Sequence, residues 1–190
     1  MRIIAGSAKG KKLVAPSGLD TRPITDMIKE ALFNVLSVGI VQSRFLDLFA
    51  GSGSVGVEAL SRGASRAIFV DKSSKAVQAI RDNLDHCNLK PNAEVFCMDV
   101  FKAIQYYDRH GEKFDYIYVD PTFTNEGIFK QFMADIDNTS ILSSDGRLII
   151  RTRRKKQMPD ELKTLRKYRL NDYGESTLHY YCIAEEVPDK

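Results

Sequence analysis

The chain has 190 residues, which is enough for one domain with a substantial hydrophobic core. Hydrophobic residues make up 43% and charged residues 28%, and the net charge is only +3, as is typical of a globular protein in water. The sequence has no apolar run long enough to cross a membrane, and its three cysteines are too widely spaced for a zinc site or a disulfide framework. We therefore expect a cytoplasmic protein without a signal peptide, a membrane segment or a metal site.

The first part of the chain predicts a small hairpin followed by a helix. Two strand-like pieces, residues 1–6 and 11–16, flank a basic turn. From Thr25 onward the pattern becomes helical, with Thr25 or Asp26 as the cap. The apolar residues that share one stripe of this helix are Met27, Ile28, Ala31, Leu32, Val35 and Leu36.

Strands and helices then alternate along the chain. Strands are expected at 44–49, 66–71, 93–99, 114–121 and 146–152, and helices between them at 55–63, 73–87, 100–111 and 127–136. The last two strands, 166–175 and 176–185, follow each other without room for a helix, so we expect them to be antiparallel. The predicted fold class is α/β: a Rossmann-like, mostly parallel sheet with a C-terminal antiparallel hairpin, which resembles the seven-stranded methyltransferase sheet.

The segment DLFAGSGSVGVEAL reads as a strand end, a glycine-rich turn and the start of a helix. Gly51, Gly53 and Gly56 match the pattern G-x-G-x-x-G, and Asp71 ends the next strand. This pattern is typical of a turn that binds a nucleotide-like ligand, including a dinucleotide, although it also occurs in a plain tight turn. Asp47 precedes the turn and would repel a pyrophosphate there, but it suits the cationic sulfonium and ammonium groups of S-adenosylmethionine.

Four acidic residues stand at the carboxyl ends of four successive predicted strands: Asp47, Asp71, Asp99 and Asp120. In an open α/β sheet, ligands bind beyond these strand ends, so we expect the four acids to line one binding site. Asp99 is suited to accept a hydrogen bond from an adenine amino group, with Val100 packing against the ring.

The segment DPTF after the fourth strand of the alternating series predicts the chemistry. The amino group of a nucleobase is a poor nucleophile, because its lone pair is delocalised into the ring. Asp120 and the carbonyl group of Pro121 could each accept one N–H of that group, and Phe123 could stack on the base, which would have to be flipped out or single-stranded. The same letters also fit a strand end followed by a proline turn.

Together these segments resemble the bacterial 16S ribosomal RNA guanine-N2 methyltransferase family over nearly the whole chain. The similar stretches are MRIIAGSAKGKKLVAP, TRPITDMIKEALFNVL, FLDLFAGSGSVGVEALSRGA and DPTF. The last differs from the D-P-P-F/Y motif of that family by Thr122, which loosens a stiff turn, and Lys29 stands where an arginine is usual.

The resemblance implies S-adenosylmethionine as the cofactor. Its methionine part would lie against Asp47, Gly51 and Gly53, its ribose against Asp71 and its adenine against Asp99. Phe49, Lys72 and Val100 also belong to the implied cofactor site, and the residues that would close over the cofactor are Arg22, Pro23 and Thr25.

Two basic regions indicate contact with a polyanion, which the resemblance identifies as ribosomal RNA or the small ribosomal subunit. We expect phosphate contacts from one group near the N-terminus and one after strand 146–152: Arg2, Lys9, Lys11, Lys12, Arg153 and Arg154. We accordingly divide the chain into an RNA-contacting hairpin, residues 1–20, and a methyltransferase domain, residues 21–186, and expect a monomer.

Three alternatives stay open at this point. The DPTF segment does not distinguish guanine N2 from adenine N6, so an adenine methyltransferase acting on RNA or DNA is the first. A nicotinamide-dependent oxidoreductase would explain the glycine pattern and Asp71, but neither Asp47 nor DPTF. A non-catalytic RNA-binding or assembly factor on the same scaffold is the third.

Overall fold

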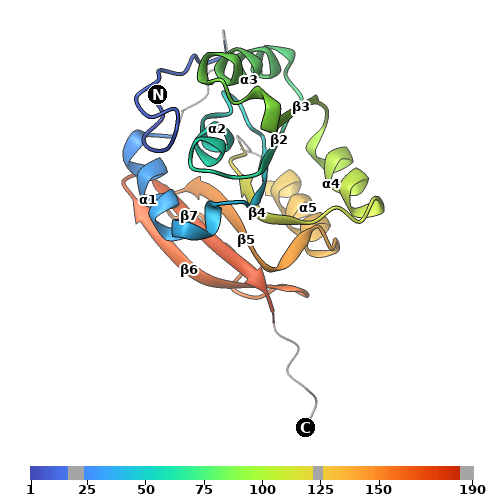
Figure 1. Ribbon diagram of the computed structural model, residues 1–190. Coiled ribbons are helices and arrows are strands. Elements are labelled where there is room, and N and C mark those ends of the chain that lie inside the picture. The colour runs from blue at the N-terminus through green and yellow to red at the C-terminus, as the bar shows by residue number, and fades with distance from the viewer. Residues whose placement is uncertain (17–23, 122–125, 185–190) are drawn as a thin grey trace.

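The computed structural model describes residues 1–16, 24–121 and 126–184. Its strands form one sheet in the order β3-β2-β1-β4-β5-β7-β6 (Figure 1). The strands are β1 (Arg44–Leu48), β2 (Arg66–Asp71), β3 (Ala93–Cys97), β4 (Phe114–Val119), β5 (Leu142–Arg153), β6 (Leu165–Tyr173) and β7 (Ser176–Ile183). The first five are parallel to one another, and β7 runs antiparallel between β5 and β6. The predicted fold class, including the C-terminal antiparallel hairpin, is confirmed.

Helices cover both faces of this sheet. They are α1 (Asp26–Leu36), α2 (Ser54–Ser61), α3 (Ser74–Cys87), α4 (Val100–Arg109) and α5 (Glu126–Asp137), with short 3-10 turns at η1 (Ser37–Ile40) and η2 (Lys90–Asn92). Helices α1, α2 and α3 share one buried hydrophobic cluster with the sheet, and α4 and α5 share the other. Neighbouring residues on a strand serve opposite clusters, as Phe45 and Leu46 of β1 do, because successive strand side chains point to opposite faces.

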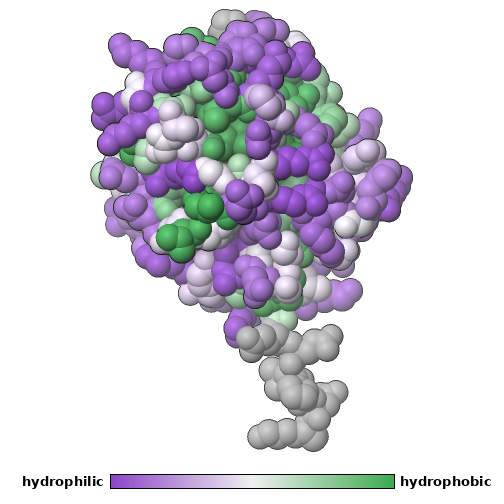
Figure 2. All heavy atoms as spheres, viewed as in Figure 1, coloured by the Kyte–Doolittle hydropathy of each residue, from purple (hydrophilic) through white to green (hydrophobic). Residues whose placement is uncertain are grey.

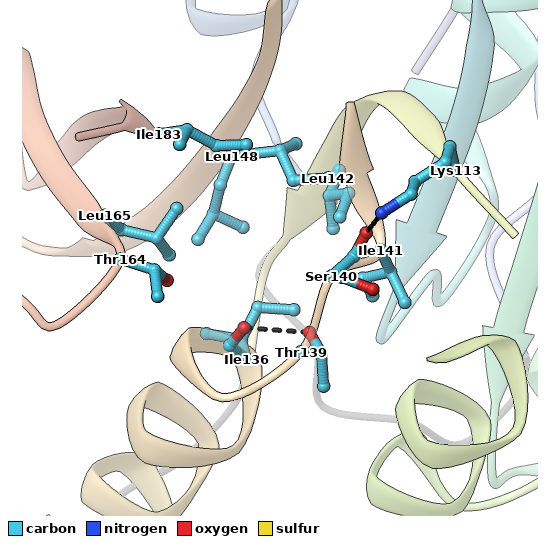
Figure 3. Close-up of a pocket in the computed structure, with 11 residues that line it drawn as sticks. Lys113, Ile136, Thr139, Ser140, Ile141, Leu142, Leu148, Thr164, Leu165 and Ile183 are labelled. Carbon is cyan, nitrogen blue, oxygen red and sulfur yellow. Dashed lines mark hydrogen bonds between the residues drawn. The ribbon is translucent and has the colours of Figure 1, made fainter. Parts of the chain in front are cut away.

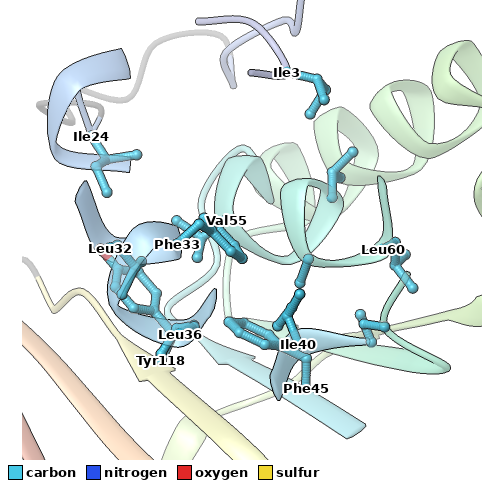
Figure 4. Packing of buried hydrophobic residues seen from close by; sticks show 14 of the residues in the cluster. Ile3, Ile24, Leu32, Phe33, Leu36, Ile40, Phe45, Val55, Leu60 and Tyr118 are labelled. Atoms are coloured by element: carbon cyan, nitrogen blue, oxygen red, sulfur yellow. The ribbon is translucent and has the colours of Figure 1, made fainter. Parts of the chain in front are cut away.

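Helix α1 begins where the sequence predicts it, but its buried face is turned. Thr25 is the N-cap, and its hydroxyl accepts a hydrogen bond from the backbone N–H of Ile28 at 3.4 Å. Met27, expected on the buried stripe, is 60% exposed. Phe33 is buried instead and stacks on Phe45 with 6.4 Å between ring centroids (Figure 4). The stripe is turned because this larger aromatic ring packs against the sheet.

The N-terminal segment folds back on itself, but it does not form the two expected strands. Its arms are joined by one antiparallel bridge, between Arg2 and Lys12. The backbone N–H groups of Ile4 and Ala5 donate instead to the carboxylate of Glu58 in α2, at 2.8 and 3.0 Å. A ladder cannot extend where its donors bond to a helix, so the prediction of strands at 1–6 and 11–16 was wrong.

The outer surface is ordinary for a globular chain. Figure 2 shows a mostly hydrophilic face with small hydrophobic areas between the polar side chains. Among the described residues, no helix has the length and apolar character needed to span a membrane.

Candidate active site at the carboxyl edge of the sheet

The four acids predicted to share a site do stand at one edge of the sheet. Asp47 is the fourth residue of β1, Asp71 ends β2, and Asp120 directly follows β4. Asp99 follows β3 and caps α4. Because strands β3, β2, β1 and β4 are adjacent and parallel, their carboxyl ends meet, so the four acids share one edge as expected, and the sheet places them in the order Asp99, Asp71, Asp47 and Asp120.

Asp47 is the most deeply buried of these acids, with 2% of its surface exposed. Its Oδ2 accepts a hydrogen bond from the backbone N–H of Gly56 at 2.9 Å. Burial raises the pKa of Asp47 well above its usual value, the Gly56 bond opposes this, and the charges of Asp120 and Asp71 add to it. A cation at this edge would therefore be stabilised by the acids around it.

The glycine turn is held by Asp71 from the neighbouring strand. Oδ2 of Asp71 accepts from the N–H of Gly51 at 2.9 Å, and Oδ1 accepts from the N–H of Ser73 at 2.9 Å. Each carboxylate oxygen can accept a second bond, so a ribose hydroxyl remains compatible with this arrangement.

Gly51 and Gly56 of the turn are required for different structural reasons. Gly51 has φ 56°, and a Cβ there would meet nothing closer than a backbone oxygen at 4.0 Å, so the turn is open on that side. A Cβ on Gly56 would lie 2.3 Å from the ring of Phe69 and 3.1 Å from Oδ2 of Asp47. Gly56 is thus required by helix-to-strand packing, whereas Gly51 leaves the turn accessible to a ligand.

The two residues expected on the adenine side differ in exposure. Asp99 is exposed, and its Oδ1 accepts from the N–H groups of Phe101 and Lys102 at 3.0 and 3.4 Å as the cap of α4. Val100 is only 3% exposed and packs in the cluster under α4, so its side chain offers little surface to a ring.

The remaining residues of the expected cofactor site divide into three kinds. Phe49 is part-buried and packs edge-to-face on Phe132, with 6.0 Å between ring centroids. Lys72 is exposed. Arg22 and Pro23 lie outside the described residues, as do Thr122 and Phe123.

Asp120 makes the contact that the sequence did not predict. Its Oδ2 lies 2.6 Å from Nη1 of Arg151, and the hydroxyl of Tyr118 donates to the same oxygen at 3.5 Å. The carboxylate is 30% exposed. Burial raises the pKa of Asp120, and the Arg151 guanidinium opposes that rise. Pro121 follows directly, so its carbonyl group belongs to the same strand end.

Arg151 is the first residue of the basic segment RTRRKK, residues 151–156, which also contains Arg153 and Arg154. In the structure it is 7% exposed, and its Nε also donates to Oγ of Ser176 at 3.4 Å. The sequence carries no clear signal for this burial, because Leu148, Ile149 and Ile150 just before it are all buried and do not alternate.

The expected RNA contacts fall into bound and exposed groups. Nε of Arg2 pairs with Asp26 at 2.9 Å, and Nζ of Lys11 donates to the carbonyl of His86 at 2.6 Å. Arg154 lies 3.8 Å from a carboxylate oxygen of Asp172. Lys9, Lys12 and Arg153 are exposed.

The N-terminal segment lies next to the glycine turn. The side-chain amide of Asn83 in α3 donates to the carbonyls of Val14 and Ser52, at 3.0 and 2.9 Å. The hydroxyl of Ser52 also lies 3.4 Å from the sulfur of Met1. Any RNA contact made by this segment would therefore be close to the cofactor turn.

A cavity of about 230 Å³ lies away from these acids (Figure 3). Its lining is mainly apolar, with Leu142, Leu148 and Leu165 among the side chains, and it includes Lys113, which bonds to the carbonyl of Ser140. Lys113 precedes β4, so the cavity is at the amino end of the strands and is not the predicted site. Within the described ranges, no cluster of three or more His, Cys, Asp or Glu residues could hold a metal.

Solved structures define the class of protein. A structure described as the putative methyltransferase yhhF from Escherichia coli matches with a TM-score of 0.82 and 27% sequence identity, covering 95% of this chain and 96% of that chain. Together with the strand order, this likeness defines a protein with the methyltransferase fold.

The sequence comparisons define the family. Residues 1–182 match the family described as conserved hypothetical protein 95, and the chain belongs to that family. A Bacillus subtilis (strain 168) protein named putative rRNA methyltransferase YlbH is 37% identical over 174 residues, which are 92% of this chain and 94% of that protein. The Escherichia coli (strain K12) protein named ribosomal RNA small subunit methyltransferase D is 32% identical over 160 residues, 84% and 78% of the two chains. The resemblance to ribosomal RNA methyltransferases is thus confirmed.

Proposed function

We propose that this chain transfers a methyl group from S-adenosylmethionine to the exocyclic N2 amine of a guanine in 16S ribosomal RNA. One observation carries the proposal: Asp120 and Pro121 directly follow β4, beside the buried Asp47 and the open glycine turn. The names of the two relatives, which mention ribosomal RNA or its small subunit, support the substrate class. The choice of guanine N2 rests on the resemblance to the 16S ribosomal RNA guanine-N2 methyltransferase family.

The carboxyl edge fits this cofactor. The turn is open above Gly51, and Asp47 and Asp71 concentrate negative charge beside it, which favours a cationic ligand over a pyrophosphate. When bound, the cofactor supplies a methyl group activated by a sulfonium. Asp71 would hold the ribose, and Asp99 the adenine amine.

The chain itself orients the target amine and receives its proton. Asp120 accepts one N–H and the carbonyl of Pro121 accepts the other, so that the nitrogen lone pair points at the methyl group. Held in this way, the lone pair would form the new C–N bond with the methyl group that the bound cofactor would supply, and the departing sulfur would keep the electron pair of the C–S bond. The nitrogen then loses the hydrogen held by Asp120 as a proton to that carboxylate. A carboxylate whose pKa is raised by burial is better suited to accept this proton.

Basic side chains on both sides of the edge would bind the RNA backbone. Lys9 and Lys12 are exposed on the N-terminal segment, and Arg153 is exposed at the end of β5. Such contacts set affinity and its dependence on salt, while the pocket around Asp120 selects the base.

The test is transfer of a labelled methyl group from S-adenosylmethionine to small-subunit particles that lack the modification, followed by nucleoside digestion. We expect N2-methylguanosine, and a loss of about 100-fold or more in rate for Asp120→Ala. Asp145→Ala, an exposed acid at the far end of β5, is the matched control and should retain the rate. N6-methyladenosine as the product would make the chain an adenine methyltransferase, and no transfer at all would favour a binding or assembly role.

A further inference from the structure

We propose that Arg151 is the positioning residue that orients the Asp120 carboxylate toward the target amine. The inference rests on the proposed function. It begins from the burial of Arg151, because a buried guanidinium is costly unless it is paired and hydrogen-bonded. Here the partner is Asp120, the acid proposed to hold the target amine, with 2.6 Å between Nη1 of Arg151 and Oδ2 of Asp120.

Three strands fix the geometry of this pair. Asp120 follows β4, Arg151 lies in β5, and Ser176, which accepts from Nε of Arg151 at 3.4 Å, begins β7. These strands are adjacent in the sheet, so the arginine is held at both sides by regular structure. Catalytic groups supported from strands are held more precisely than groups supported only by loops.

The contacts also divide the two oxygens of the carboxylate. Oδ2 receives both Nη1 of Arg151 and the more distant hydroxyl of Tyr118. Among residues 1–16, 24–121 and 126–184, no group forms a hydrogen bond to Oδ1 of Asp120. Arg151 thus holds one oxygen in place and leaves the other for an N–H of the base.

The charges around Asp120 give this role a second consequence. The groups that face it are Arg151 from β5, the phenol of Tyr118 from β4, and Asp47 from β1, whose own pKa is raised in part by the Asp120 charge. Burial raises the pKa of Asp120 and Arg151 opposes the rise, so removing the guanidinium should raise that pKa further. As the pH falls, the carboxylate would then be protonated at a higher pH than in the unmodified chain, and the acceptor for the amine would be lost.

The experiment compares Arg151→Met and Arg151→Lys with the unmodified full chain, using the same particles and labelled cofactor. We expect Arg151→Met to lower kcat by about 100-fold, as for a misplaced catalytic group, with little change in cofactor affinity. We expect the acid limb of its pH–rate profile to move to higher pH. Arg151→Lys keeps the charge but loses the fork, so it should lower kcat while restoring most of the pH profile. Arg169→Gln, an exposed arginine of β6, should behave as the unmodified chain.

Each outcome decides the inference. A lowered kcat with an unmoved acid limb in both variants would mean that Arg151 is merely structural, and an unchanged kcat would overturn the inference outright. If thermal unfolding shows that Arg151→Met does not fold, the test uses Arg151→Lys, alone and in an Asp120→Asn background. Without a titrating acid at position 120, the change at Arg151 should not move the acid limb of the pH–rate profile. If the unmodified chain transfers no methyl group, the proposed function fails and takes this inference with it. Transfer by the unmodified chain with normal Arg151 variants overturns only the inference.

Discussion

Two clusters of buried charge involve α2, and they differ in how many partners their carboxylates have. At the junction with the N-terminal segment, the carboxylate of Glu58 is fully buried and accepts four hydrogen bonds or ion pairs, from Ile4, Ala5, Lys29 and Arg62. At the carboxyl edge, Asp47 accepts one hydrogen bond from the backbone. Oδ1 of Asp120 accepts no hydrogen bond from the residues that the structure describes. The first cluster saturates its charge, whereas the second leaves acceptors for a ligand.

Burial is the largest cause of the pKa shifts in both clusters. Burial lowers the pKa of Lys29, and the charge and hydrogen bond of Glu58 oppose this fall without cancelling it. Lys29 also donates to the carbonyl of Arg2 at 2.7 Å and to Oγ of Ser54 at 3.1 Å. For Asp47 and Asp120 burial dominates and the pKa is raised. Around Asp47 the charges of Asp120 and Asp71 add to the rise, and titratable groups perturbed in this way are found at functional sites more often than at purely structural ones.

The largest effect should come from breaking the saturated cluster. Glu58→Gln keeps the size of the side chain but leaves Lys29 and Arg62 without their counter-charge. We expect the free energy of unfolding to fall by about 3–5 kcal/mol, measured by urea denaturation. Glu112→Gln, which breaks the part-exposed pair with Arg44, is the control and should cost about 1 kcal/mol or less. Equal losses in the two variants would contradict the distinction between the clusters.

The open cluster should respond in the opposite direction. Asp47→Asn keeps an oxygen to accept the Gly56 N–H and removes a buried charge. The folded-state pKa of Asp47 lies above the unfolded value, so its ionised form destabilises the fold at neutral pH, and that penalty disappears as pH falls through the raised pKa. We therefore expect the variant to have a Tm at neutral pH equal to or above that of the unmodified chain, and a weaker dependence of Tm on pH.

The same variant should bind the cofactor less well. We expect the affinity for S-adenosylmethionine, measured by calorimetry, to fall about tenfold, which corresponds to about 1.4 kcal/mol. Asp145→Asn should change neither quantity. A variant that lost stability while keeping its affinity would make Asp47 a structural residue like Glu58.

The smallest effect should come from the exposed face of the N-terminal segment. Lys9→Gln removes an exposed charge, so we expect RNA affinity to fall a few-fold and the slope of log affinity against log salt to decrease by about 0.7–0.9, the effect of one phosphate contact. Lys11→Gln should do less, because Lys11 already bonds to the carbonyl of His86. Lys130→Gln on α5 is the control. An unchanged salt slope in Lys9→Gln would remove this segment from the RNA interface.

The sequence predicted the fold and the acids of the site for one reason. Strand and helix periodicities are local, and the carboxyl ends of parallel strands must meet at one edge, so Asp47, Asp71, Asp99 and Asp120 could be assigned to that edge without knowing any contact. It went wrong where neighbours decide orientation. Met27 is exposed and Phe33, six residues further along α1, is buried instead.

Short-range patterns in the sequence are thus enough to assign the order of the elements, the glycine turn and the acids at the strand ends. Which charges are saturated depends instead on contacts between segments far apart in the chain. Glu58 meets Ile4 and Ala5 across more than fifty positions, and Arg151 meets Asp120 across thirty-one. Both pairings depend on how distant segments dock, for Arg151 on β5 lying between β4 and β7. A basic run in the sequence cannot reveal that one of its arginines is enclosed by the strands beside it.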